Sequence, residues 1–181
     1  MKTPKTIRII IMALIIASFS GCEELMDQFG INFKSDYYAF NFTIDPEETT
    51  IGDFKFKEKV YMSDLDSLLD ENDLDKDNLK SVELHELTLE IVNPNTDINF
   101  DMVEHFELYI LSGSHPELLV AEVSSVPTGT RVLTFLILDK ELKKYLDEDS
   151  YTIKLMGELN DIPAEIVEVE GKLRFKFTGG I

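Results

Sequence analysis

The chain has 181 residues, with 35 Asp and Glu against 17 Lys and Arg and a formal charge of −18. Its hydrophobic and aromatic contents, 44% and 10%, are those of a globular protein and exclude a chain that is disordered throughout. Because the negative charge repels phosphates and anionic headgroups, we expect no nucleic-acid partner.

Residues 1–21 have the three-part layout of a secretory signal. A basic stretch comes first, an uncharged run follows, and small residues close the segment: Lys2, Lys5 and Arg8, then Ile9 to Phe19, then Ser18, Ser20 and Gly21. The uncharged run is about eleven residues long, whereas a helix that spans a membrane needs about 20. We therefore predict that residues 1–21 are a signal peptide that is removed.

The only cysteine of the chain, Cys22, directly follows Phe19, Ser20 and Gly21. A lone cysteine cannot form an internal disulfide, and an unpaired thiol is a liability in an oxidising compartment. The arrangement resembles the lipobox of bacterial lipoproteins, although Phe19 stands where that pattern usually has Leu or another aliphatic residue. The resemblance implies that lipid, including chains such as palmitate, is attached to Cys22 and anchors the protein without a transmembrane helix.

Glu23 and Glu24 follow the cysteine, and no Asp stands in the position of the inner-membrane retention signal of proteobacterial lipoproteins. The acidic pair resembles the surface-export tag of lipoproteins in the Bacteroidetes group, but it also fits a chain that is acidic throughout. We expect a lipid-anchored protein of the outer membrane, on the cell surface, with the periplasmic face as the alternative.

Removal of residues 1–21 leaves 160 residues with a formal charge of −21, which is enough for one domain. The pattern of residues 22–35 is irregular and includes Gly30, so this segment is predicted to be a tether. Residues 36–181 are predicted to form the domain.

Large apolar residues alternate with small or polar ones over residues 37–44, which predicts a half-buried strand. A second alternating run follows Gly52, with Phe54, Phe56 and Val60 on one side and Lys55, Lys57 and Lys59 on the other. The two runs are expected to form a hairpin. Ser63 is an acceptable N-cap, and the leucine spacing after it predicts a helix of about two turns.

The strand signal is strongest over Val82 to Val92, where Leu84 is out of phase with Leu87, so we expect a bulge near His85 and Glu86. Further strands are predicted at residues 106–111, 118–123, 131–138, 151–156 and 167–177, with turns at 112–113 and 126–129. Residues 139–146 are predicted to form a small helix that Asp139 caps, with Leu142, Tyr145 and Leu146 facing inward.

Seven or eight strands, with helices too few and too short for parallel crossovers, predict an all-β antiparallel β-sandwich with one or two short helices. The sequences LTLEIVNPN (87–95), FELYIL (106–111), VPTG (126–129) and LDKELKKYL (138–146) resemble the Ig-like sandwich domains of uncharacterised Bacteroidetes lipoproteins. The NPN turn is also similar to that of the late-embryogenesis-abundant type 2 sandwich. The resemblance covers roughly residues 80–178, and it implies an Ig-like fold without any catalytic residue.

The acidic stretch 64–77 offers the oxygen ligands that calcium prefers. Counted from Asp73, the first, third and fifth positions are Asp, as in an EF-hand loop, but Asn78 and Leu84 stand where Gly and Glu are required. We interpret the stretch as a solvated acidic loop and keep irregular calcium binding as the alternative.

No other pattern predicts a metal, a cofactor or a catalytic residue. His85, His105 and His115 lack the spacing of zinc ligands on a helix, and Ser114 lacks the glycine-flanked turn of a nucleophilic serine. Exposed aromatic residues could bind a glycan, and Tyr37, Tyr61 and Tyr109 are the candidates, although an aromatic residue in a strand is more often part of the core.

The leading hypothesis is therefore a non-enzymatic accessory or structural protein of the cell envelope, which binds a partner protein through its strand edges by β-augmentation. The alternative is a module that captures calcium or a surface glycan.

Overall fold

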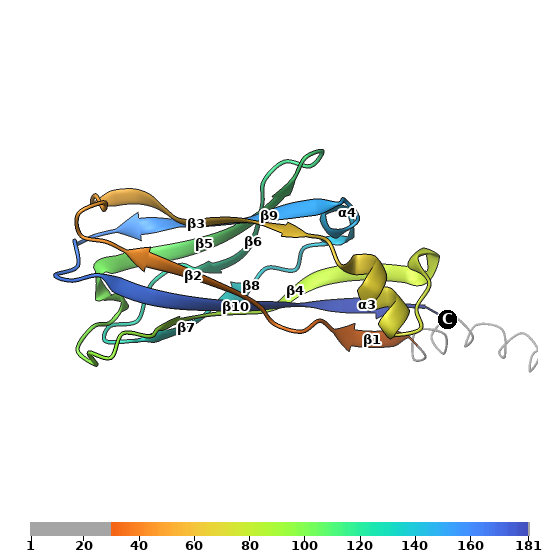
Figure 1. The fold of residues 1–181 in the computed structure, drawn as a ribbon, viewed down its shortest axis with the longest axis horizontal. Coiled ribbons are helices and arrows are strands. Elements are labelled where there is room, and N and C mark those ends of the chain that lie inside the picture. The colour runs from red at the N-terminus through yellow and green to blue at the C-terminus, as the bar shows by residue number, and fades with distance from the viewer. Residues whose placement is uncertain (1–29, 181) are drawn as a thin grey trace, which may run out of the picture.

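The computed structural model describes residues 30–180, which form two stacked antiparallel sheets of five strands each (Figure 1). Sheet A contains β1 (Ile31–Lys34), β2 (Tyr38–Ile44), β10 (Val167–Gly179), β4 (Leu79–Ile91) and β7 (Val132–Thr134). Sheet B contains β3 (Gly52–Met62), β9 (Ser150–Leu159), β5 (Val103–Ser112), β6 (Leu118–Val123) and β8 (Leu136–Ile137). The prediction of an all-β antiparallel sandwich is confirmed. The predicted signal peptide and Cys22 lie outside the described residues.

Two short α-helices, α3 (Leu65–Glu71) and α4 (Lys143–Leu146), and two 3-10 turns, η2 (Lys76–Asn78) and η3 (Phe100–Met102), connect the strands. The predicted helix after Ser63 is α3, in which Leu65 and Leu69 are buried; its N-cap is Asp64, one residue later than expected. None of the helices within residues 30–180 is both long enough and apolar enough to cross a bilayer.

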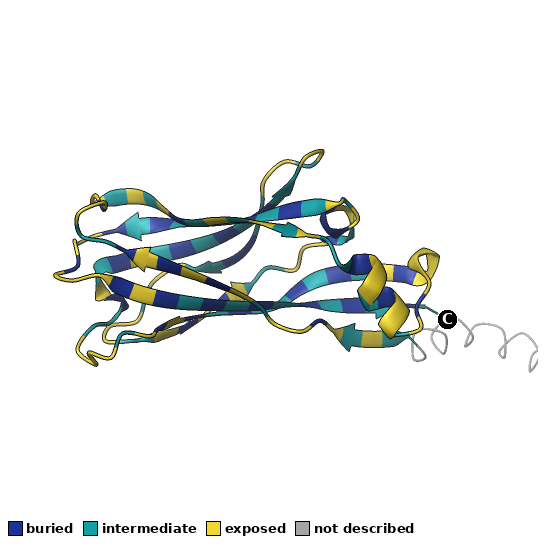
Figure 2. Cartoon of the chain, viewed as in Figure 1, coloured by how far each residue is buried: buried dark blue, intermediate teal, exposed yellow. Residues whose placement is uncertain are grey.

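The core lies between the two sheets, because every second residue of the long strands is buried (Figure 2). Its centre is aromatic: the ring of Phe106 lies 4.8 Å from Phe56, 5.7 Å from Phe100 and 6.1 Å from Phe135. Gly171 leaves room for the Phe40 ring, which a Cβ at this position would approach to 2.2 Å.

The predicted bulge in β4 is confirmed at His85. Glu86 pairs with Arg174 and Leu84 pairs with Phe175, so His85 is the extra residue between them. The bulge returns Leu84 to the buried face that Leu87 shares, which is the physical reason for the phase change in the sequence.

The expected hairpin between residues 37–44 and 52–60 is wrong, because β2 pairs with β10 in sheet A and β3 pairs with β9 in sheet B. The connection crosses from one sheet to the other. A bulge at Phe56 then reverses the sides of β3, so that Lys57 lies opposite buried Leu155 while Val60 is 63% exposed.

The predicted tether 22–35 is too long, since residues Ile31–Lys34 already form β1. Phe33 stacks on Phe177 with ring centroids 4.8 Å apart, and Ser35 exchanges two hydrogen bonds of 3.0 Å with Phe175. The strand is only four residues long, and its partner β10 lies at the other end of the sequence, so local alternation did not indicate it.

The predicted strand 131–138 is two strands, β7 in sheet A and β8 in sheet B, with buried Phe135 at the crossing. The predicted helix 139–146 is reduced to α4, and Asp139 does not cap it. The backbone N–H of Leu142 instead donates to the Val82 carbonyl (2.7 Å), which holds this segment against β4. Leu142, Tyr145 and Leu146 are buried as expected.

The strand registers place four loops together at one end of the long axis: residues 45–51, 92–99, 124–131 and 160–166 (Figure 1). We call this the distal end. Gly30 leads into β1 at the opposite, proximal end, where Ile31 pairs with Gly179.

Candidate functional site

A groove of about 360 Å³ opens at the distal end between loops 92–99 and 160–166. We call it the distal groove. Apolar side chains from both loops and from the adjoining strands line it, with polar and acidic residues around them: Asn95, Asp97, Ile98 and Asn99, Met102, residues 161–165, and Val167. Ile98 and Met102 pack against the hydrophobic core, so the floor of the groove is continuous with the interior.

Arg131 holds loop 92–99 in place from the other side of the distal end. Its guanidinium donates to four backbone carbonyls: Ile91 (3.0 Å), Asn93 (2.8 Å), Asn95 (2.6 Å) and Ile98 (2.7 Å). A loop without regular secondary structure leaves its carbonyls without partners, and the fixed fork of an arginine can satisfy several of them at once. The NPN turn is therefore an ordered part of the groove.

Hydrogen bonds also tie loop 92–99 to the start of β10 and to loop 160–166. The Asn93 side chain donates to the Ile166 carbonyl (2.8 Å) and accepts from the backbone N–H of Glu168 (2.6 Å). The Asn95 amide donates to the Glu165 carboxylate (2.8 Å). Both walls of the groove are thus fixed to each other before anything binds.

Three carboxylates surround the distal groove, those of Asp97, Asp161 and Glu165. Within residues 30–180, none of them forms an ion pair with Lys, Arg or His. The Asp161 carboxylate accepts from the backbone N–H of Ile162 (2.8 Å), a bond that does not neutralise its charge. The groove therefore combines an apolar floor with a negatively charged rim.

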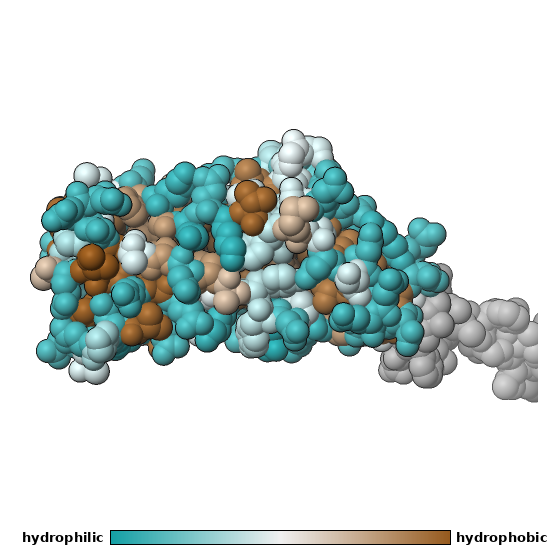
Figure 3. Space-filling model, in the orientation of Figure 1, coloured by the Kyte–Doolittle hydropathy of each residue, from teal (hydrophilic) through white to brown (hydrophobic). Residues whose placement is uncertain are grey.

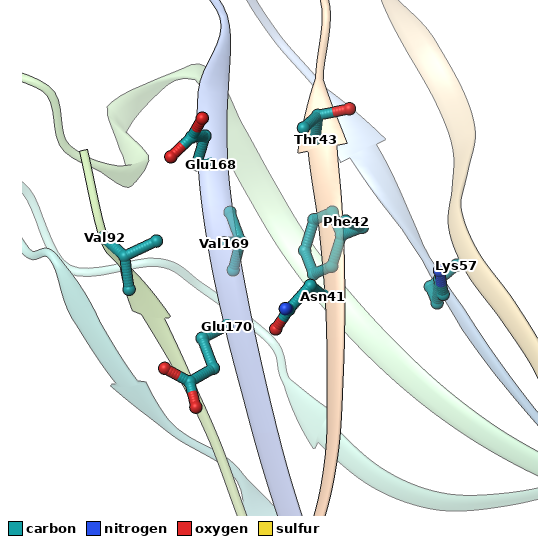
Figure 4. Close-up of a pocket in the computed structure, with 8 residues that line it drawn as sticks. All are labelled: Asn41, Phe42, Thr43, Lys57, Val92, Glu168, Val169 and Glu170. Carbon is teal, nitrogen blue, oxygen red and sulfur yellow. The ribbon is translucent and has the colours of Figure 1, made fainter.

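A second hollow, of about 540 Å³, lies on the outer side of sheet A near the same end (Figure 4). We call it the side hollow. Three strands and the residue after β4 contribute to it: Asn41, Phe42 and Thr43 from β2, Lys57 from β3, Glu168 to Glu170 from β10, and Val92. Figure 4 shows Glu168 and Glu170 on β10, between Val92 and the side chains of β2. Glu170 has an ion pair with Lys172 (3.2 Å), so Glu168 is the less compensated of the two carboxylates.

The distal loops carry four exposed aliphatic side chains, of which Val92 lines the side hollow and Ile162 lines the distal groove: Ile51, Val92, Ile162 and Ile166. They come from three of the four distal loops. Figure 3 shows apolar surface gathered toward the distal end of this face of the molecule. Clustered exposed apolar residues beside a groove are typical of a binding surface.

The acidic stretch 64–77 lies at the proximal end, in α3, η2 and the loop between them. Lys76 forms ion pairs with Asp66 (3.3 Å) and with Asp147, and the hydrogen bond to Asp147 raises the pKa of Lys76. Leu74 is buried, so the loop folds back on the core. No group of three His, Cys, Asp or Glu side chains in residues 30–180 is placed to hold a metal ion.

The three histidines lie on different elements: His85 on β4, His105 on β5 and His115 in the β5–β6 loop. His115 and Ser114 both contact the Glu148 carboxylate, with 3.7 Å between His115 Nε2 and its oxygen. The carboxylate therefore lies between the serine and the histidine, whereas a nucleophilic serine needs the histidine in that central position. Burial, together with the charge of nearby Lys34, lowers the pKa of His85.

The three candidate tyrosines do not form one platform. Tyr37 lies over the Arg174 guanidinium (4.6 Å) beside sheet A, whereas Tyr109 lies on β5 in sheet B and donates to Glu107 (2.8 Å), which raises its pKa to about 12. Tyr61 is half-buried and stacks on Tyr151, with centroids 5.6 Å apart.

The long strand edges carry features that block β-augmentation. Strand β3 has the bulge at Phe56 and the inward-facing Lys57, both of which interrupt a free edge. Strand β4 extends beyond β7, but Val82 in that part accepts from Leu142 and donates to the Glu141 carboxylate (3.1 Å). Strand β2, which pairs only with β10, is a third edge, so β-augmentation stays a prediction there.

Sequence reasoning missed the distal groove and Arg131. The NPN turn was the available signal. Three polar or conformationally restricted residues after a clearly predicted strand indicate a loop with its own hydrogen bonds. Nothing local to Arg131 indicates that it reaches this loop.

No family model matches this chain, and no curated protein matches it. Among solved structures, the decameric BFDV capsid protein is 8% identical, with a TM-score of 0.38, over 84% of this chain and 99% of that chain. The 60-mer BFDV capsid protein is 11% identical, with a TM-score of 0.36, over 83% of this chain and 93% of that chain. Similarity at this level supports no statement about assembly or function.

Proposed function

We propose that this chain is the precursor of a lipid-anchored protein of the cell envelope, without catalytic activity, whose sandwich presents the distal groove to a partner protein. The observation that carries the proposal is the position of this ordered groove, at the opposite end of the sandwich from Gly30. Only seven residues separate Cys22 from Gly30. Lipid on Cys22 would therefore hold the proximal end near the bilayer.

The dimensions of the sandwich support such a display. Strand β10 has 13 residues, which at about 3.3 Å per residue span roughly 40 Å. The distal groove would then stand roughly that far beyond the point at which the domain begins. A groove whose walls are fixed in advance loses little conformational entropy when a partner binds.

The proposed location is the outer membrane, with the domain on the cell surface. The sequence features that support it are the signal-like segment 1–21, the lone Cys22 and the acidic pair after it. Exposure to the periplasm is the alternative, which protease treatment of whole cells distinguishes from the surface.

The test compares the wild type with Cys22→Ala, by intact mass, membrane fractionation and protease treatment of whole cells. Ser20→Ala is the control, because it keeps a small residue before the cysteine. We expect Cys22→Ala to lose the lipid mass and the membrane association that the wild type and the control retain. A Cys22→Ala protein that remains processed and membrane-bound would overturn the proposed anchor.

A further inference from the structure

We propose that the distal groove and the side hollow bind an extended protein segment in which Lys or Arg stands next to a large apolar residue. This inference rests on the proposed function, because it identifies the chemistry of the partner which that function requires. Three features of the site carry it: the apolar floor, the unpaired carboxylates and the fixed walls.

The apolar floor selects an apolar side chain. Ile98, Met102 and Val167 form the part of the groove that meets the core, and Ile162 and Ile166 stand exposed beside it. Burial of an apolar side chain between them removes both surfaces from water. The groove volume of about 360 Å³ has room for one or two such side chains rather than for a folded element.

The rim selects a cation. Asp97, Asp161 and Glu165 lack a cationic partner within residues 30–180, and the nearby cation, Arg131, is occupied by four carbonyls. Glu168 adds a further negative charge on the adjoining side hollow, and the lysine of that hollow, Lys57, lies on the other side of β2 (Figure 4). A basic residue in the bound segment would complement this potential and increase the rate of association.

The same features disfavour other occupants. Two copies of this chain that met distal end to distal end would bring like charges together, since both grooves have an acidic rim. An anionic headgroup would be repelled for the same reason. A glycan would lack the exposed aromatic surface on which sugars stack, because no aromatic residue lines the distal groove and Phe42 of the side hollow is buried.

The two hollows lie next to each other along β10, so one extended segment can reach both. The distal groove ends at Val167, and the side hollow begins at Glu168 and includes Val92, whose N–H donates to the Glu168 carbonyl (2.9 Å). An extended chain can follow this path at about 3.3 Å per residue, with an apolar side chain in the distal groove and the neighbouring basic side chain at the carboxylate rim.

The test uses the full-length chain, purified in detergent and immobilised, with a phage library of random dodecapeptides as the probe. We expect the enriched peptides to share Lys or Arg next to a large apolar residue. Synthetic copies of them should bind the double variant Asp97→Asn/Asp161→Asn about tenfold more weakly. The control is Asp75→Asn/Asp77→Asn, which removes the same charge from exposed positions at the proximal end and should leave the affinity unchanged.

Ala164→Trp tests the groove itself, because it fills the groove without removing a carboxylate, and we expect it to abolish peptide binding. Enriched peptides that lack basic residues, or equal weakening by both double variants, would overturn the inference. So would unchanged binding in Ala164→Trp. If these results are negative while Cys22→Ala still releases the protein from the membrane, the partner chemistry is wrong and the anchor stands.

Discussion

Replacement of Arg131 by Gln should destabilise the protein by about 3 kcal/mol. Three of its four hydrogen bonds to the carbonyls of Ile91 and loop 92–99 are partly buried. A hydrogen bond to a charged group contributes roughly 1.5–3 kcal/mol, and we take about 1 kcal/mol for each of these three because water partly replaces the lost donors. For a chain of this size, the melting temperature should fall by roughly 6–12 °C.

Urea denaturation followed by circular dichroism measures this loss, and hydrogen exchange of loop 92–99 measures the local effect. Lys140→Gln is the matched control, since it removes the same charge from an exposed side chain. The two variants should differ by about 3 kcal/mol, and exchange in loop 92–99 should accelerate only in Arg131→Gln. If Arg131→Gln is as stable as the control, the loop does not depend on the guanidinium, and the ordered groove loses its main support.

Two further predictions concern the sandwich itself. Gly171→Ala places a Cβ within 2.2–2.6 Å of the buried Phe40 ring and should lower the free energy of unfolding by about 1–3 kcal/mol. The control Gly113→Ala, whose Cβ meets no atom within 4 Å, should be near neutral. Thermal melts compare the two variants, and equal melting temperatures would contradict this packing. Hydrogen bonds from Tyr37 and then from Arg174 lower the pKa of Glu86, so the stability advantage of the wild type over Glu86→Gln should be complete above about pH 4.3 and disappear as the pH falls through the lower folded pKa. Urea denaturation at pH 7 and pH 3 measures that difference, and an unchanged difference would show that the bonds do not stabilise the carboxylate.

Sequence periodicity predicted most strands because burial on one face of a sheet imposes a period of two on side chains. It also located the bulge in β4, because Leu84 and Leu87 must face the same core although their separation of three positions would put them on opposite faces of a regular strand. In both cases the sequence carries the information locally. The all-β class followed from these local features alone.

Pairing between strands was not predictable in the same way. Residues 38–44 pair with residues 167–173, and no local pattern identifies a partner so far along the chain. The alternating lysines of β3 led to a wrong assignment of the faces of that strand, for a related reason. At an edge strand an inward charge can still reach solvent, so Lys57 does not have to face outward as it would in a central strand.

The candidate site was harder to predict than the fold, because it is made by contacts between distant loops. Arg131 stands at the start of a predicted strand, yet its partners lie 33 to 40 residues earlier in the chain. Asp97, Asp161 and Glu165 are three of 35 acidic residues, and only the fold separates them from the others. The proposed function therefore depends on contacts between distant residues, which periodicity does not contain.

The charge pattern of β10 connects the two ends of the sandwich. Along its outward face the strand carries Glu168 and Glu170 toward the distal end, and then Lys172, Arg174 and Lys176 toward the proximal end. On this outward face the cations therefore lie near the end where Gly30 enters, and the less compensated carboxylate, Glu168, lies near the other end. If Cys22 anchors the chain as proposed, the distal end presents its negative potential on the side away from the bilayer. There the potential can steer a basic segment toward the groove. Such steering weakens as salt is added, so the association rate of a bound segment should fall with ionic strength while its dissociation rate changes little.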